Sequence, residues 1–163
     1  MDYSPEILRN KGVPVQFHTV TKGDDDWQSV YGPDGPTHQT LYIRFTHNII
    51  ADLEERYDGI MNWQSAMEDK PVSTLRSTLA IILTEESTDK VGAMLIEGRL
   101  PEYNNAIGVA WALANGVDPE IAGPLLEQAM IATDSQIDAI NKELQKATTD
   151  IGEIISTTLG EKQ

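Results

Sequence analysis

The chain has 163 residues, and its 26 acidic residues outnumber its 12 lysines and arginines, which gives a formal net charge of −14 at pH 7. This charge argues against a nucleic-acid partner bound through its phosphates and against an anionic membrane surface. The absence of cysteine excludes a disulfide framework and a thiolate metal site. The length suits one domain with a proper hydrophobic core, plus an extension.

The first residues predict a protein that is neither exported nor inserted into a membrane. Residues 1–10 show no basic segment followed by an apolar one, which a secretory signal would require. No later window approaches the run of about 20 apolar residues that spans a bilayer. We therefore expect a soluble protein.

Two segments before residue 48 show the alternation of half-buried strands. The alternating apolar residues are Val13, Val15 and Phe17 in the first segment and Leu41, Ile43 and Phe45 in the second. Residues 22–36 lie between them and are rich in Gly, Pro and Asp, so the two strands are predicted to form a hairpin with a long loop. An isolated hairpin is marginal in water, so it should pack against the helices that follow.

Three short helices are predicted between residues 48 and 83. Asn48 is a suitable N-cap for the first, which ends at Asp58-Gly59, and the second fits residues 61–68. Pro71 opens the third, because its fixed φ suits a first helical position. The third helix carries an apolar stripe typical of a core-facing helix. Its members are Val72, Leu75, Leu79, Ile82 and Leu83.

The region from residue 84 to residue 131 predicts three more helices. After a polar break, the first contains Val91 and ends near Gly98, and Pro101 begins the second. Asn115-Gly116 supplies a left-handed end, and Asp118 caps a helix over residues 119–131. The broad apolar face of the second helix comprises Tyr103, Ile107, Ala110, Trp111 and Ala114.

The last segment has apolar residues at the spacing of a heptad seam. They are Ile137, Ile140, Leu144, Ala147, Ile151 and Ile154. Two interpretations are open: an amphipathic helix packed on its own domain, or a helix that offers this face to a partner or to a second copy. We accordingly divide the chain into a hairpin and helical domain, residues 1–132, and an amphipathic C-terminal helix and tail, residues 133–163. The expected fold class is mainly α (α+β), an N-terminal β-hairpin followed by a bundle of five or six short helices and this C-terminal helix.

No motif for catalysis, phosphate binding or a metal site is recognisable, so we expect no enzyme, no cofactor and no bound metal. His18, His38 and His47 lack metal-site spacing and are interpreted as surface or packing residues. A calcium loop starting at Asp24 fails, because Ser29 replaces its turn glycine. The sequence therefore favours binding over catalysis.

Two kinds of side chain are candidates for contact with a partner. Trp27 lies in the polar segment and is either an exposed contact or an anchor folded onto the helices. Exposed methionines would add adaptability to a binding surface, although methionines fill cores more often. The methionines in question are Met61, Met67, Met94 and Met130.

The middle half of the chain resembles the tail assembly chaperones of long-tailed (siphovirus-type) bacteriophages. In that family a strand ending in an Arg-Phe pair leads into a helix similar to ALADLEERFG, then a W-Q-x-A-L-like helix, and then a P-x-x-x-L-R-x-x-L-A-x-x-L helix. The corresponding elements here are Arg44-Phe45, Ala51 to Gly59, Trp63 to Met67, and Pro71 to Leu83. Residues Ala106 to Glu120 are similar to the family's second helical block.

The resemblance implies a protein that binds the tape measure protein in the host cytoplasm and keeps it soluble during tail morphogenesis. Such chaperones are absent from the mature virion. A longer form often arises by programmed frameshifting and recruits tail tube subunits, and the ending Leu159 to Gln163 would suit the short form. The seam residues from Ile137 to Ile154, together with Trp27, are our candidates for the partner-binding surface.

Two other functions are compatible with the sequence. The first is a structural tail or head-tail component that stays in the virion. The second is an acidic inhibitor that occupies the nucleic-acid site of a host DNA-binding protein. Neither alternative requires a cofactor.

Overall fold

In the computed structural model, residues 1–131, Lys142 and Lys146 are described. The predicted seam residues Ile137, Ile140, Leu144, Ile151 and Ile154 lie outside the described residues. The described part has an α+β fold, with an N-terminal β region followed by helices.

The two predicted strands exist and form an antiparallel pair, but the second ends at Ile43, before the predicted Phe45. β1 (Val13–His18) lies against β6 (His38–Ile43), with Val13 opposite Ile43 and His18 opposite His38. The three apolar side chains that alternate along β1 are completely buried, as the sequence predicted. This sheet is therefore part of the hydrophobic core.

The segment between β1 and β6 is not a long loop, so that part of the prediction was wrong. It folds into two further antiparallel pairs: β2 (Val20–Lys22) with β3 (Trp27–Ser29), and β4 (Tyr31–Gly32) with β5 (Gly35–Pro36). Most of its Gly, Pro and Asp residues lie in the turns that join the strands of each pair, because these three residue types favour the backbone conformations of tight turns.

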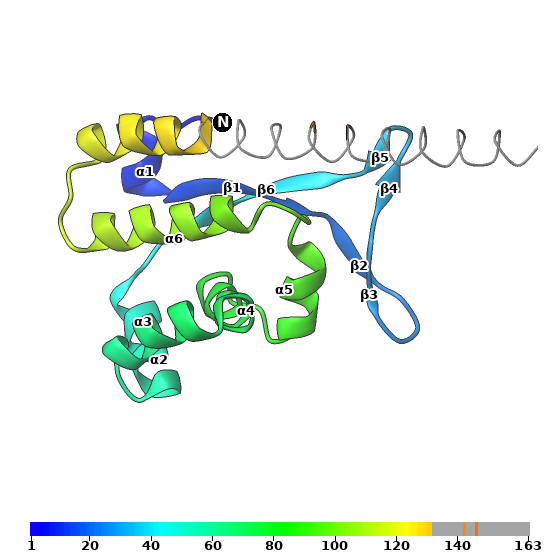
Figure 1. Cartoon of the computed structure of the whole chain (residues 1–163), viewed down its shortest axis with the longest axis horizontal. Coiled ribbons are helices and arrows are strands. Elements are labelled where there is room, and N and C mark those ends of the chain that lie inside the picture. The colour runs from blue at the N-terminus through cyan, green and yellow to red at the C-terminus, as the bar shows by residue number, and fades with distance from the viewer. Residues whose placement is uncertain (132–141, 143–145, 147–163) are drawn as a thin grey trace, which may run out of the picture.

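The three strand pairs meet at a closed triangle of backbone hydrogen bonds. The Thr19 amide donates to the Thr37 carbonyl (2.9 Å), the Thr37 amide to the Val30 carbonyl (2.8 Å), and the Val30 amide to the Thr19 carbonyl (2.8 Å). The arms β2–β3 and β4–β5 diverge from this junction at the end of the β1–β6 sheet (Figure 1). Each of the three strand pairs is thereby tied to the other two.

The helices near the sheet begin slightly differently from the prediction. α1 (Pro5–Asn10) was not predicted. α2 (His47–Tyr57) has Thr46 as its N-cap, and the Thr46 hydroxyl accepts a hydrogen bond from the Ile49 amide at 3.2 Å. The assignment of Asn48 as N-cap was therefore wrong, because the hydroxyl of Thr46 already satisfies the orphan amide of the first turn.

The next two helices, α3 (Ile60–Asp69) and α4 (Pro71–Ile82), confirm the predicted elements, including the start of α4 at Pro71. The stripe on α4 is buried except at Val72, which is 52% exposed, and at Leu83, which lies just beyond the helix and is partly buried. The prediction that Val72 belongs to the buried stripe was therefore wrong. The first turn of α4 faces α3 through Thr74 instead, whose hydroxyl donates a hydrogen bond to the Ala66 carbonyl at 2.9 Å.

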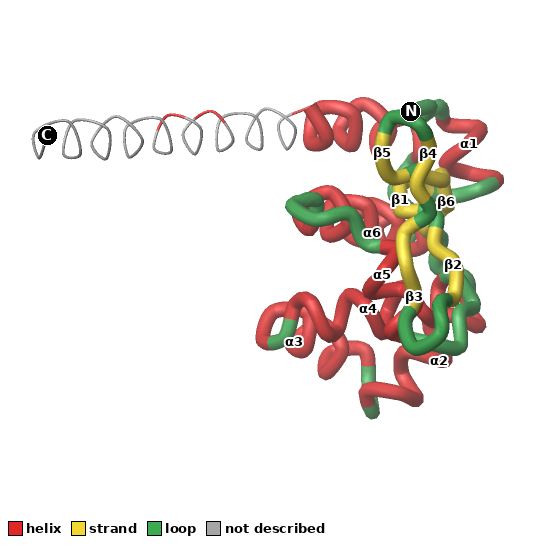
Figure 2. Tube along the Cα trace, turned by 90° about the vertical axis from the view of Figure 1, so that its right-hand side faces the viewer, coloured by secondary structure: helices red, strands yellow, loops and turns green. Residues whose placement is uncertain are grey.

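The remaining described helices are α5 (Thr88–Met94), α6 (Leu100–Ala114) and a helix over residues 119–131. The predicted stop between the last two is confirmed by the φ of +96° at Gly116 and by the Asp118 carboxylate, which accepts from the Glu120 amide at 2.9 Å. Figures 1 and 2 show α6 between two groups of helices, α2 to α4 on one side and α1 with helix 119–131 on the other.

An aromatic cluster joins α3, α6 and Phe45, which lies in the connection between β6 and α2. The Phe45 ring lies 5.8 Å from the Trp63 ring and 5.3 Å from the Trp111 ring, centroid to centroid, and the two tryptophans are 5.3 Å apart. The Trp63 indole also donates to the Thr78 hydroxyl of α4 at 2.9 Å. Trp63 is thus buried, and Trp111, which the sequence placed on an apolar helix face, packs against the core.

Tyr103 of α6 links the sheet to the turn before α6. Its hydroxyl accepts from the Ile96 amide at 2.9 Å and donates to the Gln16 carbonyl of β1, also at 2.9 Å. Burial raises the pKa of Tyr103 from its ordinary value of 10.0 to about 12. The neutral phenol is therefore the form that the folded state holds.

The raised pKa of Tyr103 predicts a loss of stability at alkaline pH. Between pH 10 and about 12 the folded state keeps the phenolic proton while the unfolded chain loses it. The stabilisation that the buried phenol gives to the folded state is therefore fully present below pH 10 and is lost as the pH rises through about 12. The two-unit shift corresponds to about 3 kcal/mol. A Tyr103→Phe variant should be less stable at neutral pH by about 1–2 kcal/mol, since two hydrogen bonds are lost, but should lack this alkaline decline. Denaturant unfolding of both proteins at a series of pH values tests this, and parallel profiles would contradict it.

Candidate protein-binding site

A cavity of about 290 Å³ opens at the end of the β1–β6 sheet. It is bounded by α1, the turn after α1, the residues at the end of β6, the C-terminal end of α6 and the connection to helix 119–131. An apolar cavity of about 150 Å³ accepts benzene, so this one has room for a large apolar side chain. Its apolar lining comprises Leu8, Ile43, Phe45, Ala110, Leu113 and Val117.

The floor of this cavity depends on a close backbone approach at Gly12. Gly12 has a φ of +105°, and a Cβ atom there would lie 2.4 Å from the Ile43 carbonyl oxygen. Only glycine allows the turn after α1 to lie this close to the end of β6. Local backbone packing therefore shapes the cavity.

Cations gather at the mouth of this cavity, although the chain is strongly acidic. Arg9 and Arg44 line it and are exposed to solvent. Lys11 directly follows α1, between Arg9 and Arg44 in the sequence, and its ammonium lies 5.4 Å from the centre of the Tyr42 ring. The Arg44 guanidinium donates to the Asn10 carbonyl at 3.3 Å. The arrangement combines several apolar side chains with two exposed guanidinium groups.

A second exposed apolar surface lies on helix 119–131. We call Ile121, Leu125 and Ile131 its outer face; they are 59%, 59% and 60% exposed. Ile121 and Leu125 are one turn apart and so lie on the same side of the helix. The opposite side is buried through Ala122, Leu126 and Met130. Helix 119–131 therefore has apolar side chains on both sides, and in the part of the chain that the structure describes only one side is covered.

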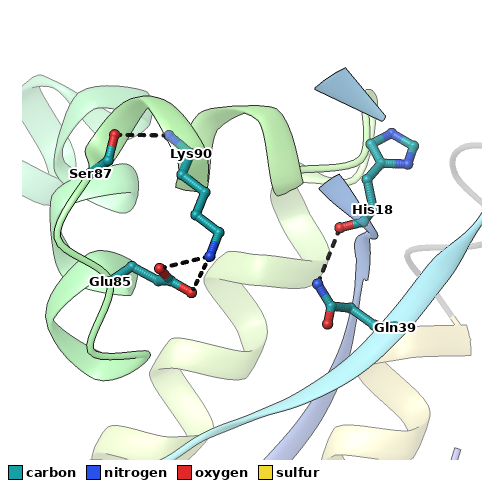
Figure 3. Close-up of polar contacts among 5 residues, drawn as sticks. All are labelled: His18, Gln39, Glu85, Ser87 and Lys90. Carbon is teal, nitrogen blue, oxygen red and sulfur yellow. Dashed lines mark hydrogen bonds and ion pairs between the residues drawn. The ribbon is translucent and has the colours of Figure 1, made fainter. Parts of the chain in front are cut away.

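Trp27 is half-buried and packs on α5, as the anchor interpretation expected. Its ring lies 5.0 Å from the Lys90 ammonium and 5.9 Å from the Lys22 ammonium. Figure 3 shows the Lys90 side chain reaching the Glu85 carboxylate, with both oxygens at 3.0 Å. A role of Trp27 in partner binding stays a prediction, as does the role of the seam from Ile137 to Ile154.

The methionines divide into exposed and buried side chains. Met61 is 81% exposed, whereas Met94 and Met130 are buried. The expectation that Met94 and Met130 are exposed was therefore wrong, because each lies on the core-facing side of its helix. Met67 is partly buried against the core.

The polar groups at the far end of β1 form a pair and not a metal centre. His18 is buried, and its Nε2 lies 3.0 Å from a carboxylate oxygen of the exposed Glu97. The hydrogen bond with His18 lowers the pKa of the Glu97 carboxyl. The His38 ring is 5.2 Å from the His18 ring, and the Gln39 amide donates to the His18 carbonyl at 3.4 Å (Figure 3). Within residues 1–131, Lys142 and Lys146, no group of three metal-ligating side chains is found.

The sequence did not indicate the cavity or its arginines. Arg9 and Arg44 are far apart along the chain, and only the pairing of β1 with β6 brings their segments together. Basic residues are few in this acidic chain, and that scarcity is the one feature of the sequence that could have drawn attention to Arg9 and Arg44.

The chain matches no protein-family model, no curated protein and no solved structure with which it was compared. Among the residues described in the structure, no helix is both long enough and apolar enough to cross a membrane.

Proposed function

We propose that this chain is a tail assembly chaperone of a long-tailed bacteriophage, which binds the tape measure protein and keeps it soluble while the tail forms. The proposal rests on the resemblance of residues 40–86 and 106–120 to that family. It is supported by the order of elements, since Arg44-Phe45 follows β6 directly and α2, α3 and α4 follow in turn. The proposed place of action is the host cytoplasm, with the protein absent from the virion.

The observation that carries the proposal is the outer face of helix 119–131. Burying a large apolar side chain is worth about 1.5–3 kcal/mol, so three such side chains left in water form a surface that a partner would cover. A tape measure protein is long and helical, and its apolar stripe fits a mode in which one amphipathic helix packs on another. The seam residues Ile137 to Ile154 and Trp27 are proposed to contact the same partner.

The charge of the chain suits a chaperone that holds an aggregation-prone partner. A net charge of −14 makes coated complexes repel one another, which keeps them in solution. A frameshifted longer form would bring tail tube subunits to the same complex. No nucleic acid, membrane or cofactor enters the proposal.

Deleting residues 133–163 should weaken binding of the tape measure protein without unfolding the domain. The deletion removes the proposed seam and leaves every described core side chain in place. The measurement is co-expression with the neighbouring tape measure protein, followed by solubility and pull-down assays, with thermal unfolding as the check on the fold. Undiminished binding would remove the seam from the proposal.

The wild-type chain provides the decisive control. Soluble co-purification with the tape measure protein supports the chaperone assignment, and an insoluble, unbound tape measure protein contradicts it. Purified phage particles should lack the chain, since a structural tail or head-tail component would remain in them.

A further inference from the structure

We propose that the cavity bounded by Arg9 and Arg44 anchors an acidic amphipathic segment of the bound protein. One large apolar side chain of that segment enters the cavity, and a neighbouring carboxylate pairs with the two guanidinium groups at its mouth. This inference rests on the proposed function, in which the tape measure protein supplies the segment.

The charges of the chain point to an acidic occupant. Acidic residues outnumber lysines and arginines by 26 to 12, so a base has many acids available within its own chain. Arg76, Lys90 and Arg99 do pair with carboxylates, at 3.9, 3.0 and 2.8 Å. Neither Arg9 nor Arg44 forms an ion pair within residues 1–131, 142 and 146, and the same is true of Lys11, Lys22, Arg56 and Lys70. What distinguishes Arg9 and Arg44 is that both line one cavity together with several large apolar side chains.

The local structure holds these arginines without using up their hydrogen-bonding capacity. Arg9 lies in the last turn of α1, where a cation complements the helix dipole. Arg44 is oriented by its 3.3 Å bond to the Asn10 carbonyl. A guanidinium has five N–H donors, so each side chain retains donors for an incoming carboxylate.

One acid of the chain beside the cavity already accepts a hydrogen bond. Asp118 lies between Val117 and Pro119, both of which line the cavity, but its carboxylate accepts the Glu120 amide at 2.9 Å. It caps helix 119–131 in that position. Within residues 1–131, 142 and 146 no carboxylate pairs with Arg9 or Arg44, so both guanidinium groups remain available to a carboxylate of the occupant.

The cavity also defines the pattern of the segment that fits it. Its volume of about 290 Å³ admits a side chain of the size of leucine or phenylalanine. On a helix, a carboxylate three or four residues away lies on the same face as that side chain. The segment is therefore an amphipathic helix with Asp or Glu one turn from a large apolar residue.

Reversing both charges tests the anchor. An Arg9→Glu/Arg44→Glu variant should co-purify about tenfold less tape measure protein from co-expressing cells than wild type does, because it repels the carboxylate. The matched control is Arg56→Glu/Lys70→Glu, which makes the same charge change in the polar groove between α2, α3 and α4 and should bind as wild type does. If wild type binds and both double variants bind equally well, the anchor is overturned. If wild type itself fails to bind, it is the proposed function that fails.

A neutral variant separates the cavity from its charges. Ala114 lines the mouth of the cavity and is exposed, so Ala114→Trp should fill the cavity and reduce co-purification about as strongly, with no change of charge. Thermal unfolding verifies that each variant is folded, and Arg9→Gln/Arg44→Gln replaces the charge reversal if that variant does not fold. Binding by Ala114→Trp at the wild-type level would show that nothing enters the cavity and would overturn the proposal.

Discussion

A Gly12→Ala variant is expected to lose about 2–5 kcal/mol of unfolding free energy. Two costs add at this position. The φ of +105° disfavours any residue with a Cβ by about 1–2 kcal/mol, and forcing an atom into packed surroundings costs about 1–3 kcal/mol more. The atom in the way is the Ile43 carbonyl oxygen, 2.4 Å from the added Cβ, and a backbone atom within a paired strand has little freedom to move aside.

Gly35 provides the matched control for this measurement. Its φ of +117° is similar, but a Cβ there would meet nothing within 4 Å. Gly35→Ala should therefore show the φ cost alone, about 1–2 kcal/mol. Denaturant unfolding of both variants gives the difference, and equal losses would show that the close approach at Gly12 carries no energy. A large difference would confirm that backbone packing shapes the cavity floor.

A Trp63→Ala variant should lose about 3–5 kcal/mol, as buried aromatic side chains do when truncated. Trp63 is nearly completely buried and touches both Phe45 and Trp111, so its removal opens a void in the aromatic cluster. It also removes the indole donor of the Thr78 hydroxyl. Because small domains are stable by only about 5–15 kcal/mol, the loss should appear as a large fall in the unfolding midpoint.

Trp27→Ala makes the same chemical change in a different environment. Trp27 is half-buried on the β2–β3 arm and contacts two lysines, so we expect a loss of about 1 kcal/mol. Thermal and denaturant unfolding of the two variants, compared with wild type, tests the ranking. A loss at Trp27 as large as that at Trp63 would mean that the arm is as important to the fold as the aromatic cluster.

Elements with strong local signals were predictable from the sequence. Pro71 begins α4 because the proline ring fixes φ at a value that suits a first helical position. Gly116 lies in the turn after α6 because glycine readily adopts a positive φ. Both are properties of a single residue and need no tertiary contact. The N-cap of α2 was misjudged by two residues, since both Thr46 and Asn48 have suitable side chains and the backbone decides between them.

Features that depend on several distant segments were not predictable. The junction requires Thr19, Val30 and Thr37 to exchange backbone hydrogen bonds. Nearly every residue has the same backbone amide and carbonyl, so the sequence does not indicate which of them will pair. The cavity likewise needs α1, the end of β6 and the end of α6 to converge. Periodicity revealed which residues are buried, but it says nothing about which segments leave a space between them.

The position of α6 against β1 has a consequence for how the chain is made. β1 leaves the ribosome early, and the helix that covers it, Leu100–Ala114, is synthesised much later. Until then Val13, Val15 and Phe17 have no complete cover, and the bond from Tyr103 to the Gln16 carbonyl cannot form. Domains whose core joins distant segments complete their folding late in synthesis. A chain that we propose to shield another protein therefore passes through a stage, during its own translation, when its first strand is unshielded.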